Sequence, residues 1–146
     1  KRRRGRGVSM VTLVAGGAAA LTMGWLRPDL YRRILTYSGT FVRQHSTDEY
    51  PHGAWEYHEH LIAEAETKPL RIYIEVGEND LNLNPNYNDG MHDWVEANNA
   101  MATALAAKGY HYRYDFAQNA GHVDGNVLRQ TLPDVLRWMW REYTCE

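Results

Sequence analysis

The segment LRIYIEVGEND, residues 70–80, decides the fold class of this chain. Aliphatic side chains fill every second position from Leu70 to Val76, and this period of two predicts a β-strand. Gly77 ends the strand, and the acidic residue Asp80 follows three positions later. A strand that leads directly into a polar turn is typical of sheets whose functional side chains gather at the strand ends.

Strand and helix patterns alternate on both sides of this segment. Further strands are predicted over Val8–Ala15, Arg33–Tyr37 and Tyr112–Phe116, and helices over Ala18–Leu26, over about Met91–Lys108 and from Thr131 onward. Asn88 or Asp89 is expected to cap the second helix, and Thr131 with Asp134 resembles a capping box for the third. The alternation predicts an α/β fold, with a mostly parallel sheet and helices on both faces.

The bulk composition fits one globular domain. The chain has 146 residues, of which 44% are hydrophobic and 23% charged, and residues 1–146 are treated as a single domain. A formal net charge of −2 gives no reason to expect a nucleic-acid partner. The single cysteine, Cys145, excludes an internal disulfide framework and a multi-cysteine zinc site. None of these properties indicates a cellular compartment.

The amino-terminal region allows a different interpretation. The basic cluster KRRRGR, residues 1–6, precedes an uncharged run from Val8 to Leu26, which resembles a secretory signal or a membrane span. However, the run is rich in small residues, the pair Gly16-Gly17 divides it, and no cleavage pattern closes it. No membrane is therefore expected, and a membrane anchor stays as a third alternative. The basic cluster is interpreted as a solvated arm.

An acid and a histidine follow two neighbouring predicted strands. Asp80 comes after the strand that ends at Val76, and His122 comes after the strand that ends at Phe116. Because parallel strands finish at one edge of a sheet, the two side chains are expected to meet there. An aspartate bound to one imidazole nitrogen leaves the other free to take a proton from a serine. Either residue alone could be an ordinary turn residue, and Asp124 is a weaker candidate acid because it lies so near His122 in sequence.

Several short motifs together resemble one family. GGAAAL at residues 16–21, RPDLY at 27–31, YSG at 37–39, VGEND at 76–80 and GH at 121–122 are similar in order and spacing to an esterase family. That family includes feruloyl, acetylxylan and enterochelin esterases and S-formylglutathione hydrolases. The resemblance spans Gly7 to Tyr143 and implies the C-terminal part of an α/β-hydrolase. It also implies serine-dependent ester hydrolysis, with His122 as the base and Asp80 as the acid, and with no metal or organic cofactor.

The nucleophile turn of this family is disrupted here. The family places its serine in a Gly-x-Ser-x-Gly-Gly turn between a strand and a helix. Counting back from Gly16-Gly17 puts Val14 at the serine position and Thr12 at the first glycine. The stretch GVSM, residues 7–10, resembles the first half of the turn, so Ser9 is the candidate nucleophile, displaced by an insertion. If residues 8–15 instead form one straight strand, Ser9 lies about 16 Å from the turn.

Ser38 and a histidine-rich loop offer further candidates. Ser38 follows the Arg33–Tyr37 strand, but no suitable turn surrounds it, so a structural role or a place in the pocket wall is favoured. The loop HGAWEYHEH, residues 52–60, carries histidines and glutamates that could bind zinc or iron. Its spacing matches no strong metal signature, so no metal is predicted and the loop is expected to line the pocket. The second oxyanion donor of the fold is expected from a loop outside this chain.

The sequence therefore predicts a serine-dependent ester hydrolase, or part of one, that acts on a small-molecule ester through Ser9, His122 and Asp80. The alternative is a catalytically inactive hydrolase-like remnant that serves as a binding module. An exposed sheet edge also predicts self-association. The motifs do not identify the ester.

Overall fold

The protein folds around one parallel sheet, and the computed structural model describes residues 8–13 and 16–142. The strands β1 (Val8–Leu13), β2 (Tyr31–Tyr37), β3 (Arg71–Asn79) and β4 (His111–Gly121) lie side by side in chain order. Every neighbouring pair is parallel, as the alternation of strands and helices predicted. The predicted first strand extended to Ala15, and its last two positions lie outside the described residues.

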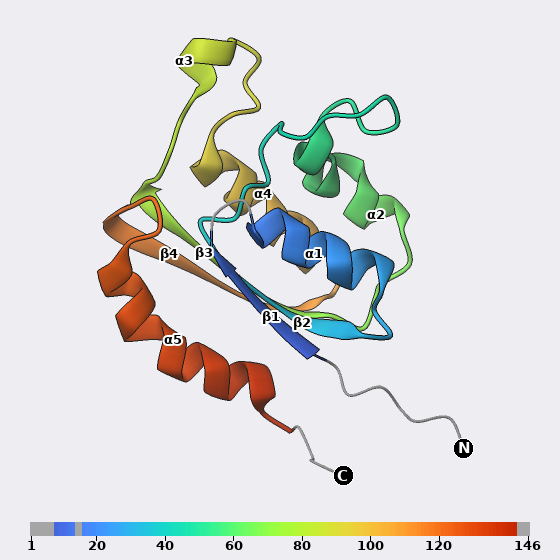
Figure 1. Cartoon of the computed structure of the whole chain (residues 1–146), viewed down its shortest axis with the longest axis vertical. Helices are drawn as coiled ribbons and strands as arrows, with labels where there is room; N and C mark the ends of the chain where they lie inside the picture. Colours follow the sequence, from blue (N-terminus) through green and yellow to red (C-terminus); the bar gives the residue numbers. More distant parts are fainter. Residues whose placement is uncertain (1–7, 14–15, 143–146) are drawn as a thin grey trace.

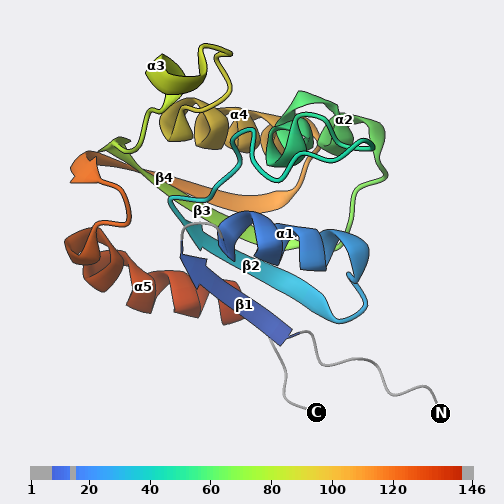
Figure 2. The same cartoon turned by 45° about the horizontal axis from the view of Figure 1, so that its top comes forward.

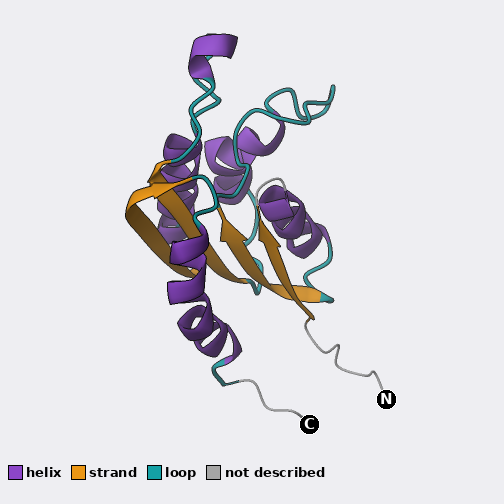
Figure 3. Cartoon of the chain, turned by 60° about the vertical axis from the view of Figure 1, so that its left-hand side comes forward, coloured by secondary structure: helices purple, strands orange, loops and turns teal. Residues whose placement is uncertain are grey.

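Helices cover both faces of the sheet (Figures 1 and 3). One face carries α1 (Gly16–Leu26), α4 (Trp94–Ala107) and the short helical turns η2 (Tyr57–Leu61) and α2 (Ile62–Glu64). The other face carries α5 (Gly125–Trp140) alone. Two further short helices, η1 (Gly53–Trp55) and α3 (Asn84–Tyr87), belong to the loops that follow β2 and β3. In Figure 1, α3 stands away from the body of the molecule.

The strand pattern divides the core into two layers. Ile72 and Ile74 of β3 pack with α1 and α4, whereas Tyr73 between them packs with α5. In β2, Ile34 faces the first layer and Leu35 faces the second. A parallel sheet covered on both faces buries nearly every strand residue, and this is why β2 and β3 read as almost continuous buried runs.

The start of α5 differs from the sequence-based expectation. The helix begins at Gly125, and its cap is Asp124, whose carboxylate accepts hydrogen bonds from the backbone of Asn126 and Val127. The predicted start at Thr131 is wrong, because the Thr131 hydroxyl bonds the Val127 carbonyl within the helix. Pro133 lies inside the helix. Thr131 and Asp134 resemble a capping box in the sequence, but both lie inside the helix.

The start of α4 is also shifted relative to the prediction. Its cap is Asp93, which accepts a hydrogen bond from the backbone N–H of Glu96. The predicted caps, Asn88 and Asp89, lie in the preceding loop, where Asn88 adopts a left-handed conformation at the end of α3. The predicted end of this helix near Lys108 is confirmed, since Lys108 is the C-cap of α4 and Gly109 after it takes a positive φ of 73°.

The described helices also bear on the membrane alternative. Within residues 8–13 and 16–142, none combines the length and the apolar character that a membrane crossing requires.

Glu75 is an exception in the second core layer. Its side chain is 1% exposed, and within the described part of the chain neither carboxylate oxygen has a hydrogen-bond partner. In the sheet it lies between Tyr37 of β2 and Asp115 of β4. Burial, followed by the nearby charges of Asp80, Asp115 and Asp124, raises the pKa of Glu75 to about 7.

The raised pKa of Glu75 predicts a specific dependence of stability on pH. The folded protein favours the protonated acid, so the penalty is absent below the unfolded pKa near 4.5, grows between pH 4.5 and about 7, and is complete above that pH. Glu75→Gln should therefore come close to the parent protein at about pH 4 and exceed it at pH 8.5 by up to about 3 kcal/mol. Urea unfolding of both proteins across this range measures the difference. The exposed Glu78→Gln is the control, and equal curves for Glu75→Gln and the parent protein at pH 8.5 would contradict the prediction.

A second prediction concerns the contact between α1 and the loop after β2. A Cβ atom on Gly17 would lie 2.8 Å from the Gly39 Cα atom and 3.3 Å from the Thr36 Cβ atom. Because a backbone atom is in the way, Gly17→Ala should lower the free energy of unfolding by about 1–3 kcal/mol. Gly125→Ala, in the first turn of α5, meets only the flexible Arg129 side chain and should change it far less. Denaturant unfolding compares the two, and an unchanged midpoint for Gly17→Ala would refute the assigned contact.

Candidate active site

Asp80 and His122 meet at the carboxyl edge of the sheet. They directly follow the last paired residues of β3 and β4, Asn79 and Gly121. The imidazole Nδ1 lies 2.6 Å from the Asp80 Oδ1 atom. The Asp80 side chain is fully buried, while 22% of the His122 side chain is exposed. The contact expected from the sequence is therefore present, with the acid behind the imidazole and the imidazole partly open to solvent.

The Asp80 carboxylate is fixed from more than one direction. Its Oδ1 also accepts a hydrogen bond from the Leu81 backbone N–H at 2.7 Å, and its own N–H donates to the Gly77 carbonyl at 3.2 Å. A carboxylate that faces Nδ1 favours the tautomer with hydrogen on that atom. The other ring nitrogen, Nε2, has no hydrogen-bond partner among the described residues. This leaves Nε2 free to exchange a proton with a bound molecule.

Ser38 anchors the histidine loop. Its hydroxyl accepts a hydrogen bond from the Val123 backbone N–H at 2.9 Å, and its own N–H donates to the Glu75 carbonyl. Ser38 is completely buried and adopts a positive φ of 51°, which turns the chain sharply at the end of β2. The geometry agrees with the structural role expected for Ser38.

Trp94 forms one wall beside the histidine. Its ring lies edge-on to the His122 ring, with centroids 6.0 Å apart and an interplanar angle of 89°. Asn98, one turn further along α4, donates to the carbonyls of Trp94 and Gly39 and so ties this helix to the loop after β2. Sequence reasoning placed Trp94 in the apolar face of α4. It missed the contact with His122, because no local pattern connects residues so far apart.

Ser9 lies low in β1. Its backbone pairs with Arg33 of β2, and Leu13 at the end of β1 pairs with Tyr37. Leu13 lies four positions after Ser9 along the strand, a rise of about 13 Å. The described part of β1 is therefore the straight strand considered as one alternative from the sequence. Val14, the residue at the family's serine position, lies outside the described residues.

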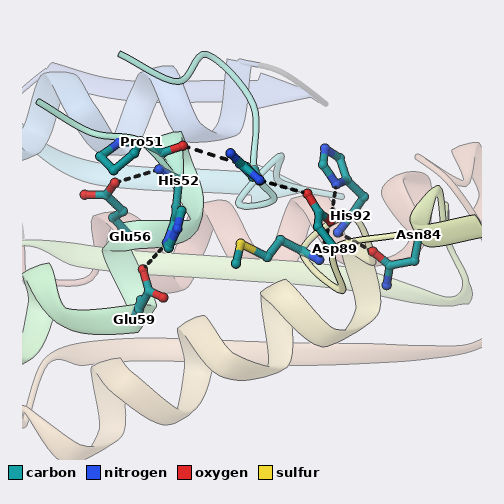
Figure 4. A network of polar contacts seen from close by, with 9 residues as sticks. Pro51, His52, Glu56, Glu59, Asn84, Asp89 and His92 are labelled. Atoms are coloured by element: carbon teal, nitrogen blue, oxygen red, sulfur yellow. Dashed lines mark hydrogen bonds and ion pairs between the residues drawn. The ribbon is translucent and has the colours of Figure 1, made fainter. Parts of the chain in front are cut away.

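The histidine-rich loop is a hydrogen-bonded surface structure (Figure 4). His52 contacts Glu59 through its ring at 2.8 Å and donates its backbone N–H to Glu56. Burial lowers the pKa of His58 to about 4, so this imidazole is neutral at pH 7, with Nε2 3.3 Å from the Phe41 carbonyl oxygen. No group of three or more metal-binding side chains occurs within residues 8–13 and 16–142.

Arg43 joins this loop to the one that follows β3. Its guanidinium binds Asp89 at 3.2 Å and the Pro51 carbonyl at 3.4 Å, and its backbone N–H donates to the Met91 carbonyl. Figure 4 shows the resulting chain of contacts between the two loops. The contacts of Arg43 thus hold the loop after β2 against the loop after β3.

A second acid–imidazole pair lies in the loop after β3. His92 Nδ1 is 2.9 Å from Asp89, and the Tyr87 ring stacks on His92 with centroids 3.9 Å apart. The Met91 backbone N–H, followed by His92, lowers the pKa of Asp89 to about 2. The sequence favours a surface or helix-end position for His92. It directly precedes Asp93, the cap of α4, and is 4% exposed because these contacts fold the loop over it. His111, for which a similar place was expected, is exposed.

Several solved structures with a similar fold are esterases. An enterobactin esterase from Shigella flexneri superposes with a TM-score of 0.65 at 22% identity, over 92% of this chain and 32% of its own. Esterase PE8 gives a TM-score of 0.59 at 21% identity, over 90% of this chain and 49% of its own. A ferulic acid esterase gives 0.61 at 16% identity, over 90% and 51%. The chain thus spans about a third to a half of these proteins. No curated protein sequence matches it significantly.

The sequence itself matches a family profile over most of its length. The match covers residues 5–139 and so includes β1, Asp80 and His122. The fold agrees with this match, since the parallel sheet and its two helical layers are those of the α/β-hydrolase esterases. The chain belongs to the putative esterase family of α/β-hydrolases.

Proposed function

We propose that this chain carries the acid–base machinery of a carboxylic ester hydrolase, with His122 as the general base and Asp80 as its orienting acid. The observation that carries the proposal is the 2.6 Å contact between His122 Nδ1 and a fully buried Asp80. Family membership supports the reaction class. A small-molecule ester is the proposed substrate, and the chemistry needs no metal or organic cofactor.

The reaction would proceed by acyl transfer. His122 Nε2 takes the proton from a hydroxyl nucleophile as the oxygen attacks the ester carbonyl. Asp80 stabilises the imidazolium that forms, and the imidazolium then protonates the departing alcohol. Water then attacks the acyl carbon as His122 removes a proton from it, and the acid product leaves as His122 passes that proton to the nucleophile oxygen. The exposed side of the His122 imidazole suits proton transfer, and the buried Asp80 carboxylate suits stabilisation of the imidazolium.

Ser9 is the proposed nucleophile, and its position makes it the least supported member of the triad. The GVSM stretch supports it, because it resembles the first half of the family's turn. The pairing of Ser9 with Arg33 counts against it, since the site lies beyond the other end of the strand. For Ser9 to reach His122, the segment from Ser9 to Leu13 would have to leave β2.

A catalytically inactive binding module is the second candidate function. The pairing of the Ser9 backbone with β2 favours this function, because it holds the proposed nucleophile away from His122. The buried Ser38 hydroxyl already accepts a hydrogen bond from Val123, which makes Ser38 a poor substitute nucleophile. Self-association through a sheet edge stays a prediction, and β1 and β4 are the two outer strands of the described sheet.

Hydrolysis of p-nitrophenyl acetate tests the acid–base pair. His122→Ala should remove turnover, and Asp80→Asn should lower kcat by about 10⁴-fold, the loss seen when the equivalent acid of trypsin is made an amide. His111→Ala, at the opposite end of β4, is the matched histidine control and should retain the parent rate. Equal activity of His122→Ala and His111→Ala would exclude the proposed base.

Covalent labelling tests Ser9 separately. A fluorophosphonate probe should label the parent protein at Ser9, and the labelled peptide should be identified by mass spectrometry. Ser9→Ala should lose both the label and the turnover, whereas Ser38→Ala should keep the label at Ser9. A folded parent protein that takes up no label and turns over no ester would support the binding module instead.

A further inference from the structure

The loops around His122 form an acidic rim. We define the rim as residues 38–56, 78–93 and 122–124, which follow or end β2, β3 and β4. Figure 2 shows that the three segments leave the sheet at its carboxyl end and that the first of them then extends over α2; the bond from Arg43 N–H to the Met91 carbonyl joins two of them. The rim carries eight carboxylates, Asp48, Glu49, Glu56, Glu78, Asp80, Asp89, Asp93 and Asp124, and Arg43 is its one fixed cation. Its net formal charge is therefore −7 with neutral histidines.

Basic side chains lie elsewhere in the described structure. Residues 8–13 and 16–142 contain eleven lysines and arginines, and ten of these lie outside the rim. Arg33 and Arg71, for example, bind backbone carbonyls near the end of α5, at the opposite edge of the sheet. Arg129, one turn into α5, is bonded to Asn126, and its guanidinium lies beside Gly125, directly after the rim. Among the described residues, the rim is therefore mainly acidic, and most basic side chains lie outside it.

The polar contacts of the rim leave most of its negative charge in place. Arg43 is bound to Asp89, so the rim cation is already paired. Asp93 accepts hydrogen bonds from the Asn82 side chain and from the Glu96 backbone N–H. Asp124 accepts one from the Asn126 backbone N–H at the start of α5. Glu78 is exposed and accepts a bond from the Asn119 backbone. None of these donors except Arg43 carries a full positive charge.

Helix dipoles act in the opposite direction but are smaller. The amino-terminal ends of α1, α4 and α5 follow the carboxyl ends of β1, β3 and β4, and each contributes roughly half a positive charge. Three such ends supply about 1.5 charges against a net charge of −7. Two of them are already capped by Asp93 and Asp124. A negative potential should therefore dominate the approach to His122.

We infer that the site accepts uncharged and cationic esters and discriminates against anionic ones. The inference rests on the proposed ester hydrolysis and names its substrate class. Each carboxylate of the rim repels an acidic substrate as it approaches and attracts a cationic one. The effect acts on kcat/KM, because it changes encounter and binding while the chemistry at the ester carbonyl stays the same.

Three thioacetate esters of similar size test this inference. They are acetylthiocholine, its uncharged tert-butyl analogue, and the thioacetate of 3-mercaptopropionate, and the released thiol is measured at pH 8. At about 10 mM salt, where the screening length is about 30 Å, kcat/KM should be about 10-fold higher for the cation than for the neutral ester. The anion should be lower by a similar factor. At about 0.5 M salt both ratios should shrink towards 1, while the neutral ester changes little.

A matched set of variants assigns the preference to the rim. Glu78→Gln, Asp93→Asn and Asp124→Asn combined remove three charges, and asparagine preserves both helix caps. Glu64→Gln, Glu66→Gln and Glu142→Gln remove three charges from exposed positions outside the rim. The rim variant should reduce the cation-to-anion ratio at low salt by about 3–10-fold, and the control should leave it unchanged. Because a ratio is measured, a general loss of activity cancels.

The outcomes separate this inference from the proposed function. Hydrolysis of all three esters with equal, salt-independent kcat/KM would overturn the inference and leave the hydrolase intact. If no ester is hydrolysed, the methyl ketone analogues of the three esters are titrated while the His122 imidazole signals are followed by NMR. Tighter binding of the cationic ketone at low salt supports the acidic rim without turnover. Equal or anion-favouring affinities refute it.

Discussion

The close approach of β3 and β4 at their carboxyl ends is the constraint on which the candidate site depends. A Cβ atom on Gly77 would lie 2.5 Å from the Ala120 carbonyl oxygen and 2.7 Å from that of Gly121. Only glycine therefore permits the strands to come together where the pairing shifts register. The two loops then start so close to each other that Asp80 and His122 come into contact. The glycine of the VGEND motif is explained by this packing.

The same region of the sheet contains groups that a purely structural core would avoid. Glu75 is buried without a hydrogen-bond partner in the described chain, and one Asp80 oxygen is in the same condition. Buried acids of this kind cost stability, and such costs commonly occur where a fold carries a site. The charge of Asp80 is one reason, after burial, why the pKa of Glu75 is raised and Glu75 favours its neutral form. A neutral Glu75 leaves Asp80 as the acid whose charge faces His122.

Much of the fold was predictable from the sequence, and the reasons for the failures are physical. Period-two patterns identified β3 and β4, because alternate side chains of a strand point to opposite faces of the sheet. The contact of Asp80 with His122 followed from strand order, since parallel strands end at one edge. The start of α5 was not predicted, because Thr131 and Asp134 imitate a capping box inside the helix, while burial of the Leu128 and Leu132 face decides the outcome. The burial of His92 depends on contacts within a loop that has no periodic signal.

The position of Ser9 is decided by competition between strand pairing and turn formation. Residues Ser9 to Leu13 pair with five successive residues of β2. A turn that brought Ser9 to the carboxyl edge would give up this pairing. At roughly 1 kcal/mol for each backbone hydrogen bond, the loss is about 5 kcal/mol. That is comparable to the whole stability of many domains. An active conformation would therefore need compensating contacts of similar size, whereas Asp80 and His122 are already in place. The contact of Asp80 with His122 thus depends on the close approach of β3 and β4, whereas the position of Ser9 depends on the pairing of β1 with β2.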